Sequence, residues 1–263
     1  MSVPVVIAFV IAILVETALP IAAGFWAESH LDVAWRVFAY GALVFAVSQL
    51  ALRIPLLNLL STRVGITRES GFPMILAWSA FLAATAALFE QAGRYLGYRF
   101  LFKNTKRNWN NAVMYGLGHG GLESIFIVGL PTIITLANIL TIPGLDPQAM
   151  GLSPEQTQQL LSAKEQIATL GWWMPITAAL ERVLTLGFQV SMSVLVLQVF
   201  LRGSWRWLGY ALGLHFLVDL AAPLAATYVN VFLAEAIVAV FAGASLYWAL
   251  RLRPARAPAR TRS

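Results

Sequence analysis

Cysteine is absent from the 263-residue sequence, and charged residues are scarce at 11%. Without cysteine the chain can form no disulfide, no thiolate metal site and no cysteine nucleophile. A typical soluble domain carries about 25% charged residues, so the low charge content argues against one. Hydrophobic residues make up 59% of the chain, and its mean hydropathy is +0.73. The composition therefore predicts a protein embedded in a lipid bilayer.

The apolar runs are continuous rather than alternating, which argues against a transmembrane β-barrel and favours helices. A helix needs about 20 apolar residues to cross a bilayer. We expect an all-α polytopic bundle of seven or eight spans, forming a single domain over residues 1–250. An extramembrane loop at about 141–170 should contain a short helix that begins at Ser153-Pro154, and a basic disordered tail occupies 251–263. Seven apolar runs are the candidate spans: about 3–24, 33–52, 72–100, 111–140, 172–201, 207–222 and 228–250.

Lysine and arginine gather in the loops 103–107 and 202–206 and in the tail. Basic residues favour the cytoplasmic side, so we expect a cytoplasmic C-terminus and an external segment 141–170. The stretch 53–71 carries three arginines and would lie outside, against this rule. Either the topology of the first spans differs, or this stretch forms an interfacial or re-entrant helix. We expect an integral protein of a prokaryotic plasma membrane, and the net charge of +6 indicates no nucleic-acid role.

Three pairs of ionisable residues lie four positions apart within the apolar runs. A spacing of four places both members of a pair on one helical face. A charged group at the centre of a membrane helix costs about 2.5–3.5 kcal/mol, so such residues usually mark a hydrated functional site. The pairs are Glu90 with Arg94, His119 with Glu123, and His215 with Asp219.

Glu90, His119 and His215 share a depth in the membrane. Each lies about eight to ten residues from the basic end of its run, which places all three roughly 12–15 Å from the same surface at 1.5 Å per residue. Glu181-Arg182 would lie nearer the outer side. The three pairs can therefore converge at one level, although the sequence does not say which helices are neighbours.

These residue types suit peptide hydrolysis. That reaction needs an activated water, a group that stabilises the oxyanion, and a proton for the leaving amine. A buried Glu90 can hold and deprotonate water, and His215, one turn from Asp219, can polarise the substrate carbonyl. Glycines at 116, 118, 120 and 121 surround His119 and allow a substrate backbone or a neighbouring helix to approach closely.

The order of these motifs resembles the YhfC family of intramembrane proteases and, more distantly, the glutamic-type CAAX-processing and PrsW-like proteases. The resemblance covers the third to sixth apolar runs, more than half of the chain. It rests on Phe89-Glu90-Gln91-Ala92-Gly93-Arg94, on Tyr115-Gly-Leu-Gly-His119-Gly-Gly-Leu-Glu123, on Glu181-Arg182 and on His215-Phe-Leu-Val-Asp219.

The resemblance implies a glutamic-type enzyme in which His119 shares the catalytic water with Glu90. The catalytic residues would be Glu90, His119, His215 and Asp219, supported by Arg94, Glu123, Glu181 and Arg182. Two positions depart from the family pattern. Gln91 stands where a second glutamate is usual, which leaves one carboxylate to act as base, and Gln189 stands where many relatives have a histidine.

Other classes of intramembrane protease lack their motifs here. The sequence contains no His-Glu-x-x-His motif of a zincin and no Gly-x-Ser-Gly motif of a rhomboid-type serine protease. Asp219 is the only aspartate within an apolar run, so a two-aspartate site cannot form. We expect no cofactor. Zinc is the alternative, since His119 and His215 with Glu90, or with another nearby carboxylate, offer suitable ligands.

The sequence predicts an intramembrane endopeptidase that cleaves a membrane-embedded or membrane-proximal protein or peptide. One alternative is a proton-coupled transporter, because intramembrane acids and histidines also form proton relays. The absence of two related halves with broken helices argues against it. The other alternative is an inactive scaffold of the same fold, which Gln91 keeps open. The oligomeric state cannot be predicted.

Overall fold

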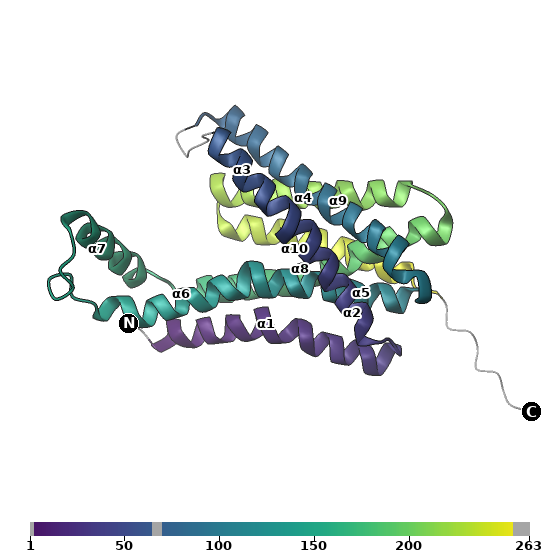
Figure 1. Ribbon diagram of the computed structural model, residues 1–263, viewed down its shortest axis with the longest axis horizontal. Coiled ribbons are helices and arrows are strands. Elements are labelled where there is room, and N and C mark those ends of the chain that lie inside the picture. The colour runs from purple at the N-terminus through teal and green to yellow at the C-terminus, as the bar shows by residue number, and fades with distance from the viewer. Residues whose placement is uncertain (1–2, 65–69, 255–263) are drawn as a thin grey trace, which may run out of the picture.

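The computed structural model describes residues 3–64 and 70–254, and within them the chain is a bundle of helices without strands (Figure 1). The tail residues 255–263, and Arg68 and Glu69 of the 53–71 stretch, lie outside the described residues. Seven helical segments in the described part are long and apolar enough to cross a membrane, which confirms the predicted all-α polytopic fold. They are Val3–Leu31, Trp35–Thr62, Phe72–Asn104, Trp109–Gly144, Trp173–Arg202, Arg206–Tyr228 and Val231–Arg251.

The second span is longer than its apolar run. Helix α2 (Trp35–Phe45) passes through a π-helical segment, η1 (Ala46–Arg53), into α3 (Ile54–Val64). Pro55 has no N–H for the carbonyl four residues earlier, and an interrupted hydrogen-bond ladder favours such a π segment. The sequence-based boundary at residue 52 was too early, because the helix continues through Arg53, whose side chain lines a cavity.

The fourth span is built in the same way. Helix α5 (Trp109–Glu123) continues through the π segment η3 (Ser124–Gly129) into α6 (Leu130–Thr141), whose second residue is Pro131. A 3₁₀ turn, η4 (Ile142–Gly144), ends this segment.

The segment 141–170 contains a helix, α7 (Pro154–Ala168), as predicted, and its place outside the membrane stays a prediction. Ser153 accepts a hydrogen bond from the Gln156 backbone, and the Gln156 side chain bonds back to the Ser153 backbone. This capping box fixes the start of the helix where Ser153-Pro154 predicted it. In Figure 1, α7 lies apart from the bundle, beyond the end of α6.

Helix α8 (Trp173–Arg202) is the central element of the bundle. It packs against α1 (Val3–Leu31), α5, α9 and α10, and every residue from Phe188 to Val199 is buried. The other spans are α4 (Phe72–Phe100), followed by η2 (Leu101–Asn104), α9 (Arg206–Tyr228) and α10 (Val231–Arg251).

Helices α2 and α5 approach closely enough that their backbones touch. A Cβ atom at Gly118 would lie 1.9 Å from the carbonyl oxygen of Phe38, and one at Gly41 would lie 2.0 Å from that of Tyr115. Only glycine fits at either position, since real Cβ atoms do not approach backbone oxygens so closely. This contact sets the position of His119, which follows Gly118 directly.

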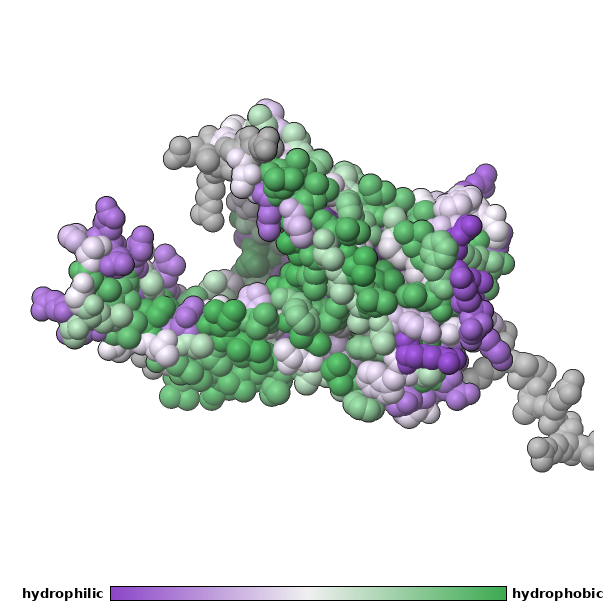
Figure 2. Space-filling view, in the orientation of Figure 1, coloured by the Kyte–Doolittle hydropathy of each residue, from purple (hydrophilic) through white to green (hydrophobic). Residues whose placement is uncertain are grey.

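The basic segments gather at one end of the bundle. The guanidinium of Arg107 lies 5.0 Å from the Phe200 ring, and that of Arg253 lies 5.0 Å from the Trp109 ring. Loop 103–107, the end of α8 and the end of α10 therefore lie at the same end of the bundle. Figure 2 shows hydrophilic residues at this end and on α7, with a broad apolar surface between them.

Candidate active site

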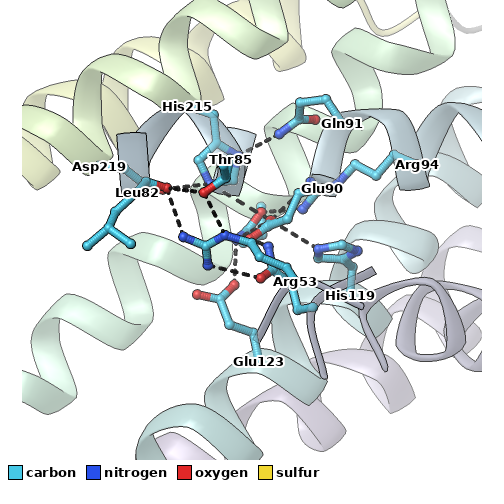
Figure 3. Close-up of polar contacts among 12 residues, drawn as sticks. Arg53, Leu82, Thr85, Glu90, Gln91, Arg94, His119, Glu123, His215 and Asp219 are labelled. Atoms are coloured by element: carbon cyan, nitrogen blue, oxygen red, sulfur yellow. Dashed lines mark hydrogen bonds and ion pairs between the residues drawn. The ribbon is translucent and has the colours of Figure 1, made fainter. Parts of the chain in front are cut away.

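Glu90 lies at the centre of a polar cluster, on the buried face of α4 (Figure 3). Its Oε2 lies 3.1 Å from His119 Nε2 of α5 and accepts a hydrogen bond from Arg94 Nη1 at 3.2 Å. Its Oε1 accepts a hydrogen bond from Gln49 Nε2 of η1 at 2.9 Å. Gln189 of α8 also donates to Oε2, at 3.3 Å. Side chains from four helical elements thus position one carboxylate.

His215 of α9 brings its ring to the same carboxylate. Its Nε2 lies 3.8 Å from Glu90 Oε2 and 3.4 Å from Asp219 Oδ2, while its Nδ1 lies 2.5 Å from Gln91 Nε2. With its amide nitrogen toward the ring, Gln91 donates to Nδ1, and an imidazole that is neutral then carries its proton on Nε2. The Phe188 ring packs edge-on against the imidazole, with the centroids 5.5 Å apart. The imidazole therefore directs its Nε2 proton toward two carboxylates.

Arg94 is fully buried, and all three of its guanidinium nitrogens have acceptors. Nη1 donates to Glu90, Nη2 to Gln189 Oε1, and Nε to Ser193 Oγ at 3.2 Å. A buried charge is tolerated only when it is paired in this way. Arg94 does not line the cavity, so it supports Glu90 from behind the cavity wall.

A second polar cluster, formed by Glu123, Glu181 and Arg182, connects to the Glu90 cluster through Gln189. The Gln189 amide nitrogen donates to Glu123 as well as to Glu90. Arg182 then donates from Nη1 to Glu123 Oε1 at 3.4 Å and from Nη2 to Glu181. Gln189, at the position where the resemblance predicted a histidine, thus bridges two carboxylates.

A cavity of about 380 Å³ lies in front of these residues. Arg94 and His119 do not line it and connect to it through Glu90. The side chains of Asp219 and Glu181 remain 34% and 35% exposed, so the cavity communicates with the surface. The structure therefore brings all eight predicted site residues together. The six that line the cavity are Glu90, Glu123, Glu181, Arg182, His215 and Asp219.

The glycines around His119 serve helix packing. A Cβ at Gly116 would lie 2.5 Å from the Cα of Val190, and one at Gly120 would lie 2.7 Å from the Cβ of Gln189. The sequence left open whether a substrate or a neighbouring helix approaches these positions. Helices α1, α2 and α8 occupy this space.

Sequence reasoning missed Gln49 and Arg53. Both line the cavity, but Gln49 lies within an apolar run and Arg53 was assigned to the polar stretch after it. The two residues are four apart, the same spacing that identified the other pairs. The Gln49–Arg53 spacing was therefore the signal that could have found them.

The donor types for a metal are present, but their arrangement does not fit one. Both histidines face Glu90 Oε2, and the Arg94 guanidinium already donates to that oxygen at 3.2 Å. A divalent cation placed there would be repelled by the arginine charge. Within residues 3–64 and 70–254, no three His, Asp or Glu side chains are arranged to hold a metal ion.

Comparison with known proteins gives one family. A family model described as YhfC intramembrane metalloprotease matches residues 15–242. The chain is 27% identical over 237 residues to a protein of Bacillus subtilis (strain 168) described as "Uncharacterized membrane protein YhfC", covering 89% of this chain and 91% of that protein. No solved structure matches the chain. The more distant likeness to CAAX-processing and PrsW-like proteases stays a prediction.

Proposed function

The chain belongs to the YhfC intramembrane metalloprotease family, and we propose that it is an intramembrane endopeptidase in which Glu90 activates the hydrolytic water. The family supports proteolysis within the membrane. The glutamate mechanism is our own proposal, and one observation carries it. Glu90 lines a cavity inside apolar spans, and histidines from two other helices face one of its carboxylate oxygens.

Glu90 has room for a water on the oxygen that the histidines do not face. Among the described residues, Oε1 accepts a hydrogen bond only from Gln49. A carboxylate oxygen offers about two lone-pair sites, so a water in the cavity can donate to the second site on Oε1. Oε2 is occupied by His119, Arg94 and Gln189, which keep the carboxylate from rotating.

The reaction then follows from the positions of these groups. Glu90 takes a proton from the water, and the water oxygen bonds to the carbonyl carbon of the scissile peptide. His215 Nε2–H donates to the developing oxyanion, a role for which Gln91 holds its proton on the correct nitrogen. Glu90 returns its proton to the peptide nitrogen as the C–N bond breaks. His119 and Arg94 keep Glu90 in place throughout.

The family description implies a metal, and the ligand set expected from the sequence is His119 and His215 with Glu90. Because the Arg94 guanidinium occupies the shared oxygen of this set, we derive no step through a metal.

Cleavage assays in reconstituted membranes test the proposal. The purified protein in liposomes is incubated with a panel of transmembrane peptides and a membrane-protein extract, and fragments are identified by mass spectrometry. Glu90→Gln should lower the cleavage rate by about 10²–10⁴-fold, the usual contribution of acid–base catalysis. His119→Gln should also lower the rate, because the Glu90 carboxylate loses a partner that holds it in place. Glu235→Gln, which removes a carboxylate in α10 outside the cavity lining, is the matched control and should cleave normally.

Wild-type rates in Glu90→Gln would refute the assignment of the base. A different result would support an inactive scaffold. In that case the wild type cleaves nothing, and the wild type and Glu90→Gln bind a membrane partner equally well. Proton-coupled uptake of a solute into the liposomes would support the transporter.

A further inference from the structure

Arg53 places a guanidinium in the cavity wall beside the proposed catalytic site. It is the last residue of η1 and lies against α4 (Figure 3). Its Nε donates to Thr85 Oγ1 at 3.2 Å, its Nη2 to the Leu82 carbonyl at 2.8 Å, and its Nη1 to Gln49 Oε1 at 3.1 Å. These contacts fix the side chain while leaving two of its five N–H donors unused.

All the acceptors of Arg53 are neutral. In the described part of the chain, no carboxylate oxygen lies within 4.0 Å of its guanidinium. Arg182, the other arginine in the cavity lining, lies between Glu123 and Glu181. Glu90 and Asp219 attract the Arg53 charge from a longer distance. Neither carboxylate contacts the guanidinium, so its two remaining N–H groups are available to an acidic ligand.

Each acidic residue of the cavity has a nearer partner than Arg53. Glu90 binds Arg94, and Asp219 lies beside His215. Glu123 and Glu181 both pair with Arg182. Arg53 is therefore the one cavity arginine in the described residues whose charge the protein does not neutralise by a direct ion pair.

Gln49 connects Arg53 to the proposed base. It accepts from Arg53 with its amide oxygen and donates to Glu90 Oε1 with its amide nitrogen, at 3.1 and 2.9 Å. A group bound to Arg53 would therefore lie about one side chain away from the oxygen that we propose holds the water. The adjoining wall is apolar and includes Leu82 and Ala86.

We propose that Arg53 binds a carboxylate of the substrate and thereby selects apolar peptides that carry an acidic group close to the scissile bond. A guanidinium binds a carboxylate through paired charge-assisted hydrogen bonds, which give both orientation and affinity. The carboxylate is either the free C-terminus of the peptide or an acidic side chain. The proposal rests on the proposed function in one respect, because it treats the bound peptide as a substrate.

A binding experiment tests this without requiring hydrolysis. The full chain in nanodiscs is titrated with a fluorescent apolar peptide long enough to span the bilayer. The peptide is made in three forms: with a free C-terminus, with a C-terminal amide, and with a C-terminal amide plus one glutamate. The wild type should bind at least one acidic form about tenfold or more tightly than the neutral amide. The preferred form identifies the source of the carboxylate.

Three variants separate charge from packing. Arg53→Gln should lose the preference, and Arg53→Lys should keep part of it. Thr85→Val removes one neutral acceptor but leaves the charge, so it should keep the preference.

Equal binding of all three peptides by the wild type would overturn the proposal, even if Arg53→Gln failed to fold. Retention of the preference in Arg53→Gln, or its loss in Thr85→Val, would also contradict it. Cleavage is followed in parallel. A wild-type protein that shows the preference but cleaves none of the peptides would count against the proposed hydrolysis and not against the Arg53 site.

Discussion

The side-chain amide of Gln91 lies 2.5 Å from Nδ1 of His215, across the contact between α4 and α9. The resemblance stated in the sequence analysis predicts a second glutamate at this position, and a glutamine there left an inactive scaffold open. The geometry gives the glutamine a role of its own. By donating to Nδ1, it leaves the imidazole proton on Nε2, which faces Glu90 and Asp219.

Gln91→Leu should therefore lower the catalytic rate while leaving the substrate affinity nearly unchanged. Without the amide, the His215 ring can rotate and no longer directs its proton at the oxyanion, and we expect a loss of at least about tenfold in kcat. Steady-state cleavage assays measure both constants. Gln198→Leu, a buried glutamine on α8 outside the cavity lining, is the control. An unchanged kcat in Gln91→Leu would remove the positioning role.

The buried pair of Glu90 and Arg94 should show strong coupling in stability. Glu90→Leu alone leaves the arginine charge uncompensated, which costs about 3–5 kcal/mol for a buried ion pair. The double variant Glu90→Leu/Arg94→Met removes both charges and should be more stable than Glu90→Leu. Unfolding in detergent, analysed as a double-mutant cycle, measures the coupling. Purely additive effects would mean that the two charges do not depend on each other.

Chelation should leave the activity intact. Arg94 donates to the carboxylate oxygen that a metal would need, so we expect substoichiometric zinc in the active protein by elemental analysis. One tightly bound zinc per chain, with activity lost on chelation and restored by zinc, would show that this expectation is wrong. His119, His215 and Glu90 would then act as ligands rather than as base and hydrogen-bond partners.

Gly118→Ala should destabilise the protein by roughly 1–3 kcal/mol or more, because the added methyl group would overlap the Phe38 carbonyl and push α5 away from α2. The displacement would also move His119, so cleavage should fall with stability. Thermal unfolding in detergent measures the first effect. Gly213→Ala in α9, where a Cβ would meet no atom within 4 Å, is the matched control. Equal stability of the two variants would contradict the close α2–α5 contact.

The orientation in the membrane can be tested directly, because the chain has no cysteine of its own. We expect Gln158→Cys in α7 to react with a membrane-impermeant reagent on intact cells. Lys106→Cys, at the basic end of the bundle, should react only after permeabilisation, in line with the bias of basic loops toward the cytoplasm. The reverse pattern would invert the topology and place the C-terminus outside.

The sequence predicted most of the architecture because membrane helices carry strong local signals. Long apolar runs located seven spans, and Ser153-Pro154 located the start of α7. The predicted end of the second span at residue 52 was wrong because an arginine lowers the local hydropathy and therefore looks like the end of a span. Arg53 continues the helix because its charge faces an internal cavity.

The same distinction between local signals and tertiary packing applies to the candidate site. The sequence by itself determined that Glu90, His119 and His215 lie at one depth, since helical rise and spacing are local properties. Only the tertiary structure decided that α4, α5 and α9 bring them to one carboxylate, and that Gln49, Gln91 and Gln189 hold it and its partners in place. Neutral glutamines carry no charge signal in an apolar run, and contacts between residues far apart in the sequence depend on how the helices pack.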